Sequence, residues 1–288
     1  MNKGQKLVSL IKESFNSEEK DFTKISIRSA IVLLAIPMII EMMMESVFAI
    51  VDIYFVGQLG KTAVSTVGLT ESILMVVYSV GMGISMAATA MVARRFGEKG
   101  CKKAGTAAFQ LIFSGLSLAV IISVTTFIFA EDLLRLMGGS ENLVAYGGNY
   151  TKIIFGSNIV IVLLFLITGI FRGAGNAQIA MRTLILANGL NIVLDPIFIF
   201  GLGSFEGFGL EGAAIATTTG RGIGVLYQLY ILFNGKQKLK ILKENIVIQW
   251  STIKKIFEIA GGGMGQFLID SASWIFLMRI ISDFGEEV

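Results

Sequence analysis

Three acidic residues fall within one apolar stretch of the sequence. Glu41, Glu45 and Asp52 lie in Ile27–Gly57, which is otherwise rich in Ile, Val and Met. In a helix, Glu45 lies about 40° around the axis from Glu41 and Asp52 about 20°, so the three carboxyl groups form one stripe. A charge in the middle of a membrane helix costs about 2.5–3.5 kcal/mol on insertion scales, so the stripe must face protein or water. It predicts an ion or substrate pathway, or else neutral carboxyl groups hydrogen-bonded in the packing.

A second set of polar residues lies in two later apolar stretches. Asn191 and Asp195 are four residues apart in Gln178–Gly201, and therefore share one helical face, while Thr217 lies in Leu210–Phe233. Carboxylate, amide and hydroxyl oxygens are the ligands of hard cations, and a desolvated carboxyl beside another acid suits a proton site. The alternatives are a structural hydrogen bond from neutral Asp195 and a threonine hydroxyl that bonds only to the preceding turn.

The elements that must position these residues are apolar helices. The chain has 288 residues, of which 54% are hydrophobic and 16% charged, whereas a soluble domain has about 25% charged residues. About 20 apolar residues cross the roughly 30 Å hydrocarbon core of a bilayer. We expect an all-α integral membrane protein with seven spans: Ile27–Gly57, Val64–Val92, Ala104–Ala130, Tyr146–Ile170, Gln178–Gly201, Leu210–Phe233 and Thr252–Ser282.

Lys and Arg gather on alternate connections between these spans. They are frequent before the first span, in Arg94–Lys103, between the fourth and fifth spans, and in Lys236–Lys255, whereas the other connections hold Lys61 and Arg135. Cytoplasmic loops carry the excess of basic residues. The pattern predicts a multi-pass protein of the cell membrane with its amino terminus in the cytoplasm.

This orientation brings the polar residues of three spans to one depth. Asp52, Asn191, Asp195 and Thr217 lie roughly 7–15 Å below the outer surface at 1.5 Å per residue. We therefore expect their side chains to form one cation site.

A weak internal repeat suggests how the chain is divided. Ile39–Gly60 aligns with Met264–Gly285, and the aligned positions include two acids, two serines and two glycines. Parallel repeats of this kind occur in secondary transporters. We expect a cytoplasmic segment with a partly interfacial helix at 1–26, a six-helix lobe at 27–233, a basic cytoplasmic linker at 234–251, and at 252–288 a seventh transmembrane helix that begins a second, pseudo-symmetric lobe. The chain is then a fragment or a truncated form of a longer protein.

The composition excludes several classes of function. There is no His and only one Cys, Cys101, so His-dependent triads, zinc fingers and disulfide frameworks are absent. The net charge of +3 is too small and dispersed for a nucleic-acid partner. An intramembrane enzyme using Glu41 and Glu45 as acid and base is a remaining alternative. A seven-span receptor fits the span count but would usually place its amino terminus outside.

The residues also carry a family resemblance. The first span, with Ile36-Pro37, Val51-Asp52 and Phe55 to Gly60, resembles the opening helix of the multidrug and toxic compound extrusion (MATE) transporters. The same order and spacing continue through three further stretches, which are Val92 to Gly97, Phe171 to Asn176, and Asn191 to Pro196 followed by Gly212 to Thr217. The resemblance runs from about Arg28 to Phe233, and the family's two six-helix lobes would explain the repeat.

The resemblance implies an antiporter, not an enzyme, that exports cationic or amphipathic small molecules while H⁺ or Na⁺ enters. It needs no cofactor or metal beyond a possible Na⁺, works in the lipid bilayer, and is expected to be a monomer when complete. The family's cation site falls on Asp52, Asn191, Asp195 and a hydroxyl of Thr217 or Thr218.

The sequence departs from the family pattern in two ways. Glu41 and Glu45 are more acidic than expected, and Asn176 stands where an acid is common. Glu41, Glu45 and Met42 are candidates for the substrate cavity, although Met can also be a lipid-facing filler. A lipid-linked precursor flippase of similar fold is the alternative function, but it would require a basic cavity.

Overall fold

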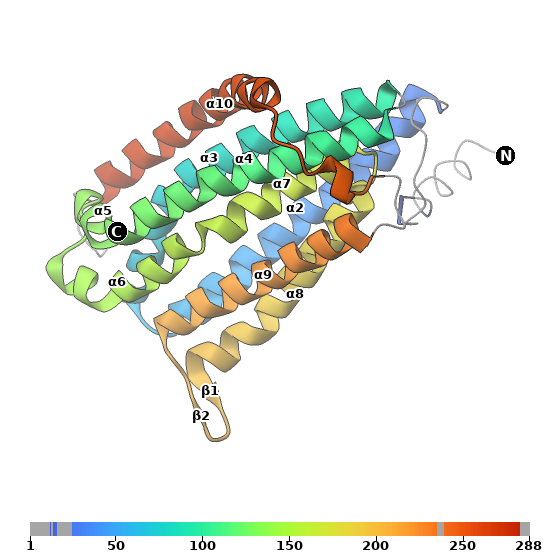
Figure 1. The fold of residues 1–288 in the computed structure, drawn as a ribbon. Helices are drawn as coiled ribbons and strands as arrows, with labels where there is room; N and C mark the ends of the chain where they lie inside the picture. The colour runs from blue at the N-terminus through green and yellow to red at the C-terminus, as the bar shows by residue number, and fades with distance from the viewer. Residues whose placement is uncertain (1–11, 13, 16–24, 99, 235–238, 283–288) are drawn as a thin grey trace.

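The computed structural model describes residues 12, 14–15, 25–98, 100–234 and 239–282, and these are almost entirely helical. Figure 1 shows the long helices lying side by side along a common direction. The elements are α2 (Ile27–Gly57), α3 (Lys61–Gly97), α4 (Cys101–Ile128), α5 (Ala130–Leu136), α6 (Glu141–Gly156), α7 (Asn158–Gly173), α8 (Ala177–Phe200), β1 (Gly201–Leu202), β2 (Phe205–Glu206), α9 (Leu210–Asn234), the 3-10 helix η1 (Lys243–Asn245) and α10 (Trp250–Ser282). The all-α fold expected from the sequence is therefore confirmed.

The fourth predicted span is divided into two helices. α6 ends at Gly156 and α7 begins at Asn158. At the break, the amide of Ser157 donates to the carbonyl groups of both Ile153 and Ile154, and its hydroxyl donates to Ile154 at 2.7 Å. The bond to Ile154 closes a tighter turn than the α-helical bond to Ile153, and this tighter turn marks the break between the two helices. The sequence analysis also did not predict α5 or the β1–β2 hairpin.

Five of the described helical segments are long and apolar enough to cross a membrane. They are Ile27–Gly57, Lys61–Gly97, Lys102–Ile128, Glu141–Gly173 and Ala177–Phe200, the fourth of which joins α6 and α7. α9 and α10, with 25 and 33 residues, have the length of a span, but polar and charged residues dilute their apolar character. The sixth and seventh spans, and the division into two lobes, therefore remain predictions.

α3 and α7 form the centre of the bundle. Most of α7 is buried, and the main core cluster includes Phe155, Leu166 and Phe171 beside residues of α3 and α4. Small residues allow the two backbones to approach, since a Cβ added at Gly169 would lie 2.5 Å from the carbonyl oxygen of Ser85. The hydroxyl of Thr89 then donates to the Gly169 carbonyl at 3.0 Å.

The described part of the basic linker packs against the amino-terminal end of α4. Asn245 donates from its side chain to the carbonyl of Lys102 and to Thr106, both at 3.0 Å, and Lys102 pairs with Glu244 at 2.7 Å. The expected interfacial helix before the first span falls largely outside the described residues, as does Gly285 of the repeat. α10 continues from the linker and packs along α3, where the hydroxyls of Ser79 and Ser271 are 2.8 Å apart.

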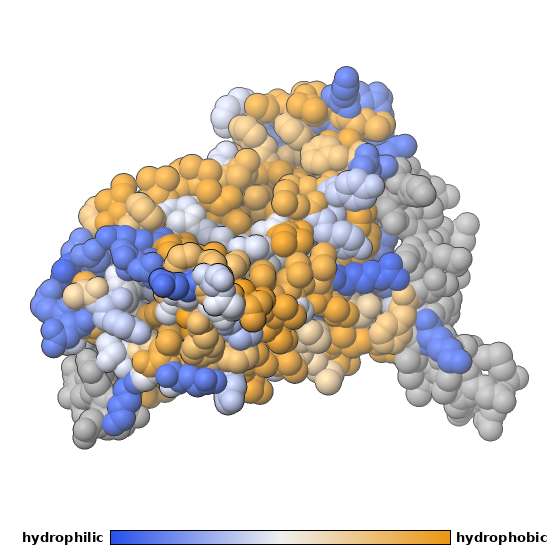
Figure 2. Space-filling model, turned by 90° about the horizontal axis from the view of Figure 1, so that it is seen from below, coloured by the Kyte–Doolittle hydropathy of each residue, from blue (hydrophilic) through white to orange (hydrophobic). Residues whose placement is uncertain are grey.

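The surface agrees with a position in the bilayer. Figure 2 shows a broad hydrophobic face, with the hydrophilic residues gathered mainly towards the ends. On α2, Ile39, Met42, Met43 and Ile50 are all more than half exposed. Such a surface is unfavourable in water and suits contact with lipid or with another apolar surface.

Candidate cation site

Asn191 holds together two of the polar residues predicted to form a cation site. Its side-chain amide donates to Asp195 Oδ1 at 3.2 Å and to Thr217 Oγ1 at 3.1 Å. Asn191 and Asp195 are one helical turn apart on α8, and Thr217 reaches them from α9. Asn191 is 2% exposed and Asp195 is fully buried. The structure thus brings three of the four predicted residues into direct contact.

Glycine on α9 allows this contact. A Cβ at Gly220 would lie 2.6 Å from the carbonyl oxygen of Ala187 and 3.3 Å from Asn191. A side chain there would force the two helices apart, so the small residue keeps Thr217 within reach of Asn191. Pro196 follows Asp195 inside α8. Because the proline nitrogen carries no hydrogen, it cannot donate the α-helical hydrogen bond to the carbonyl of Ile192.

Asp52 reaches the same region from α2. It is partly buried, and its carboxylate interacts electrostatically with that of Asp195. α2 packs mainly against α8, which places the two acids on facing helices. The fourth predicted residue therefore lies on the helix that faces the other three.

Two buried oxygen atoms of this group make no hydrogen bond within the described part of the chain. They are Asn191 Oδ1 and Asp195 Oδ2. An unpaired buried polar atom costs about 1–3 kcal/mol, so a native structure usually supplies a partner. Together with Thr217 and Asp52, these atoms form the set of oxygen ligands that suits a hard cation or a shared proton.

A second polar group lies next to the first and contains Arg221, a base that is 9% exposed. From α9 its guanidinium donates to the hydroxyl of Tyr78 at 3.1 Å and lies 3.9 Å from a carboxylate oxygen of Glu45. It is also 5.3 Å from the ring centre of Phe48. The stripe of α2 and the polar face of α9 are therefore joined by a charge pair across the bundle.

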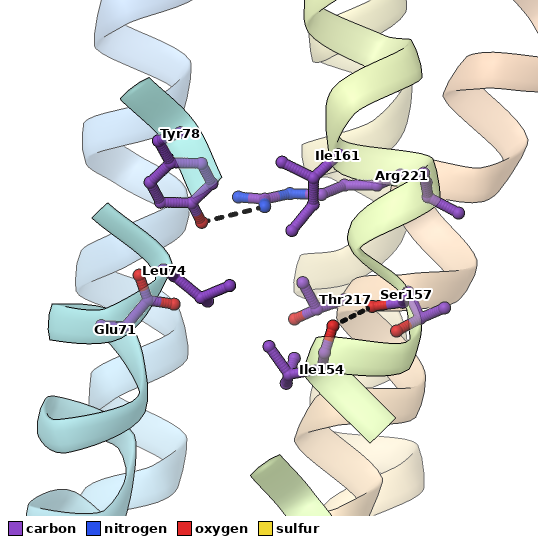
Figure 3. A pocket seen from close by; sticks show the side chains of 10 residues that line it. Glu71, Leu74, Tyr78, Ile154, Ser157, Ile161, Thr217 and Arg221 are labelled. Carbon is purple, nitrogen blue, oxygen red and sulfur yellow. Dashed lines mark hydrogen bonds between the residues drawn. The ribbon is translucent and has the colours of Figure 1, made fainter. Parts of the chain in front are cut away.

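A small cavity of about 10 Å³ lies beside Arg221 and Thr217. Figure 3 shows Glu71 and Tyr78 on α3 facing Arg221 and Thr217 across it, with Ser157 at the helix break nearby. A cavity of about 10–15 Å³ is at the lower limit for one water molecule. Thr217 lines this cavity and also contacts Asn191, so the two polar groups are continuous.

The remaining predicted residues lie elsewhere on α2. Glu41 is 2% exposed and forms an ion pair with Arg172 of α7. Met42 points to the outside of the lobe and is 71% exposed, whereas Glu45 is half-buried beside Arg221. The three substrate-cavity candidates therefore have three different environments.

Sequence reasoning did not single out Glu71, Tyr78 or Arg172. Glu71 could have been found, because it is the one acid in an otherwise uncharged stretch from Val64 to Val92. Arg172 lies at the end of its helix, where a base is ordinary, and only the structure shows its pairing with Glu41.

A bundle of membrane-length helices with buried acids and other polar side chains between them is typical of a membrane transport protein rather than a soluble domain. The sequence model of the MatE family matches residues 37–197. The chain belongs to the MatE family, whose members are multi-pass membrane transporters and not enzymes.

Similar proteins carry related names. The chain is 28% identical over 234 residues to the probable multidrug resistance protein NorM of Thermotoga maritima, covering 81% of this chain and 50% of that protein. It is 26% identical over 249 residues to the multidrug export protein MepA of Staphylococcus aureus, covering 86% and 54%. The chain therefore spans about half the length of these curated relatives.

Solved structures agree on the fold. A MATE crystal structure in the bent conformation superposes with a TM-score of 0.79 at 29% identity, covering 94% of this chain and 57% of that one. An inward-facing MATE family transporter gives 0.75 at 28% identity, covering 86% and 56%. A transporter of the MOP superfamily from Pyrococcus furiosus, described as having a binding pocket of reversed polarity, gives 0.80 at 31% identity, covering 86% and 54%.

Proposed function

We propose that this chain is the cation-binding lobe of an antiporter that exports cationic or amphipathic compounds across the cell membrane while H⁺ or Na⁺ enters. The contact of Asn191 with both Asp195 and Thr217, beside two unpartnered buried oxygen atoms, carries the proposal. The names of the relatives, a multidrug resistance protein and a multidrug export protein, support the class of cargo. They give no support to a lipid-linked precursor flippase.

The proposed coupling uses the repulsion between two acids. With no cation bound, the carboxylates of Asp52 and Asp195 repel each other across the contact of α2 with α8. A bound Na⁺ or proton offsets that repulsion and favours closer packing of the two helices. Because α2 also carries Glu45 and the exposed Met42, occupancy of the cation site changes the position of the surface available to an exported compound.

Gradient-driven dye efflux by the full-length protein tests this function. We expect efflux to require an imposed proton or sodium gradient, and both Asp52→Asn and Asp195→Asn to lower its rate by about tenfold or more, within the usual range of coupling energies. The variant with both changes should be no slower than the slower single variant, because both acids belong to one site.

Asp132→Asn is the matched control, since this acid lies on α5 and its side chain is 67% exposed. It should transport at the wild-type rate at equal expression. Wild-type efflux by Asp52→Asn, or independent and additive losses for the two site acids, would contradict the proposed coupling.

A further inference from the structure

Arg221 places a fixed positive charge inside the lobe, beside the proposed cation site. It extends from α9 across the small cavity towards α3, as Figure 3 shows. Its contacts with Tyr78 and Glu45 account for part of its guanidinium, while Nε makes no hydrogen bond in the part of the chain that the structure describes. A buried base of this kind requires nearby acids to offset its desolvation.

Acids and phenols from several helices face this charge. Arg221 interacts electrostatically with side chains on three other helices, namely Glu45 and Asp52 of α2, Glu71 and Tyr78 of α3, and Tyr150 of α6. From α7 the cavity is lined by Val160 and Ile161, which are uncharged, and α8 supplies Asp195, which interacts with Asp52. Asp52 is therefore shared between the guanidinium and the proposed cation site.

The two polar groups are also joined by direct contact. Thr217 lines the cavity with Arg221 and Glu71, and its hydroxyl accepts the hydrogen bond from Asn191. Thr218 lines the same cavity, and its hydroxyl is unpartnered among the described residues. A change of charge in the Arg221 group therefore acts on Asp52, which interacts with both Arg221 and Asp195, and charges inside a protein act more strongly than in water.

We propose that Arg221 is a tethered counter-cation that lowers the affinity of the acidic site for its coupling ion, and that Glu71 opposes this effect by offsetting the guanidinium charge. The charge of Arg221 offsets part of the negative charge of Asp52 and so weakens the attraction of a free cation to the site. The charge of Glu71 offsets part of the charge of Arg221 and so strengthens that attraction again. The pair would set the ion concentration at which the site fills. This inference rests on the proposed function, because it concerns the affinity of that same site.

The test compares variants of opposite sign in the full-length protein. We expect Arg221→Gln to lower the concentration of Na⁺ or H⁺ for half-maximal dye efflux on the order of tenfold, since the site loses a repelling charge. Glu71→Gln should raise that concentration, because the site loses an attracting charge. The variant with both changes should return near the wild-type value, and Arg221→Lys should retain it.

A second readout does not depend on transport. Added Na⁺, or a lower pH, should protect the purified full-length protein against thermal unfolding. The half-maximal protecting concentrations of the wild type and the variants should rank in the same order as in the efflux assay. A purely structural role for Arg221 would lower the unfolding temperature without moving these concentrations. Shifts in the same direction for Arg221→Gln and Glu71→Gln, or no shift in either, would overturn the inference.

The two proposals can fail separately. If efflux depends on an ion but the variants do not move the half-maximal concentration, the role of Arg221 fails and the antiporter function stands. If wild-type efflux responds to neither ion, the antiporter function fails, and ion protection of the purified variants still decides the role of Arg221. An absence of both responses in the wild type overturns both proposals.

Discussion

At the scale of residues, two acids of the α2 stripe are paired with bases from different helices. Arg172 of α7 pairs with Glu41, and Arg221 of α9 faces Glu45. Glu41 is closed off inside the bundle, whereas Glu45 is partly exposed. The same kind of side chain on one helix face therefore has two roles, a buried ion pair and a member of the polar group beside the cavity.

The ion pair of Glu41 with Arg172 should behave as a coupled unit. Arg172→Met leaves the buried carboxyl of Glu41 without its partner and should destabilise the protein by about 3 kcal/mol. Replacing both residues with Met should recover most of this loss, because no buried charge then lacks a partner. Thermal or denaturant unfolding of the purified protein in detergent measures both effects.

The comparison with Glu41→Met completes a double-mutant cycle. If the destabilisation of the double variant equals the sum of the two single variants, the residues are not energetically coupled, and the pair does not contribute to the stability of the lobe.

At the scale of elements, glycine determines how closely the helices pack. Gly169 on α7 lies against the backbone of Ser85 on α3, and Gly220 on α9 lies against that of Ala187 on α8. In a membrane, where apolar surfaces gain little by leaving lipid, such close contacts contribute a larger share of helix association. The position of Thr217 beside Asn191 depends on one of them.

Gly169→Ala should therefore destabilise the bundle. A methyl group would lie 2.5 Å from the carbonyl oxygen of Ser85, and relief of that overlap should cost about 1–3 kcal/mol. Gly189→Ala on α8 is the matched control, since beyond the adjacent residues and the nearby backbone of α8 no described atom lies within 4 Å of the added Cβ. It should be neutral or stabilising by about 0.5–1 kcal/mol.

Unfolding temperatures of the two variants, measured in the same detergent, give the comparison. Equal effects of Gly169→Ala and Gly189→Ala would mean that the α3–α7 contact is looser than the structure indicates.

At the scale of the whole molecule, two basic segments that are distant in the sequence lie together at one end of the bundle. Lys102 at the start of α4 pairs with Glu244 of η1, while the β1–β2 hairpin lies at the far end of α8 and α9 (Figure 1). This arrangement agrees with the alternation of Lys and Arg along the chain and makes the expected orientation testable.

Cysteine labelling should place the hairpin outside the cell. In a Cys101→Ser background, Ser204→Cys at the exposed hairpin should react with a membrane-impermeant maleimide on intact cells. Lys103→Cys, also exposed, should react only after the membrane is made permeable. The reverse pattern would refute a cytoplasmic amino terminus, and labelling of both positions on intact cells would refute the proposed crossing of the membrane.

Much of the helical framework could be predicted from the sequence. The bounds expected for the first, fifth, sixth and seventh spans lie within two residues of α2, α8, α9 and α10. This accuracy has a local cause, because hydropathy, length and the polar connections determine where a membrane helix begins and ends. The break at Ser157 was missed, since α6 and α7 together form one continuous apolar stretch and the hydrogen bonds at the break have no distinct sequence pattern.

The candidate site, too, could be predicted from the sequence only in part. The candidate residues could be found in the sequence, because Asp52, Asn191, Asp195 and Thr217 are ionisable or polar residues within apolar stretches. Their similar depth in the membrane stays a prediction from their positions along those helices. Which of these side chains meet depends on the tertiary structure. Asn191 joins Asp195 to Thr217, Arg172 pairs with Glu41, and Arg221 faces Glu71 across the cavity. These pairings depend on the rotation and approach of helices distant in the sequence, which interhelical packing determines and local periodicity does not.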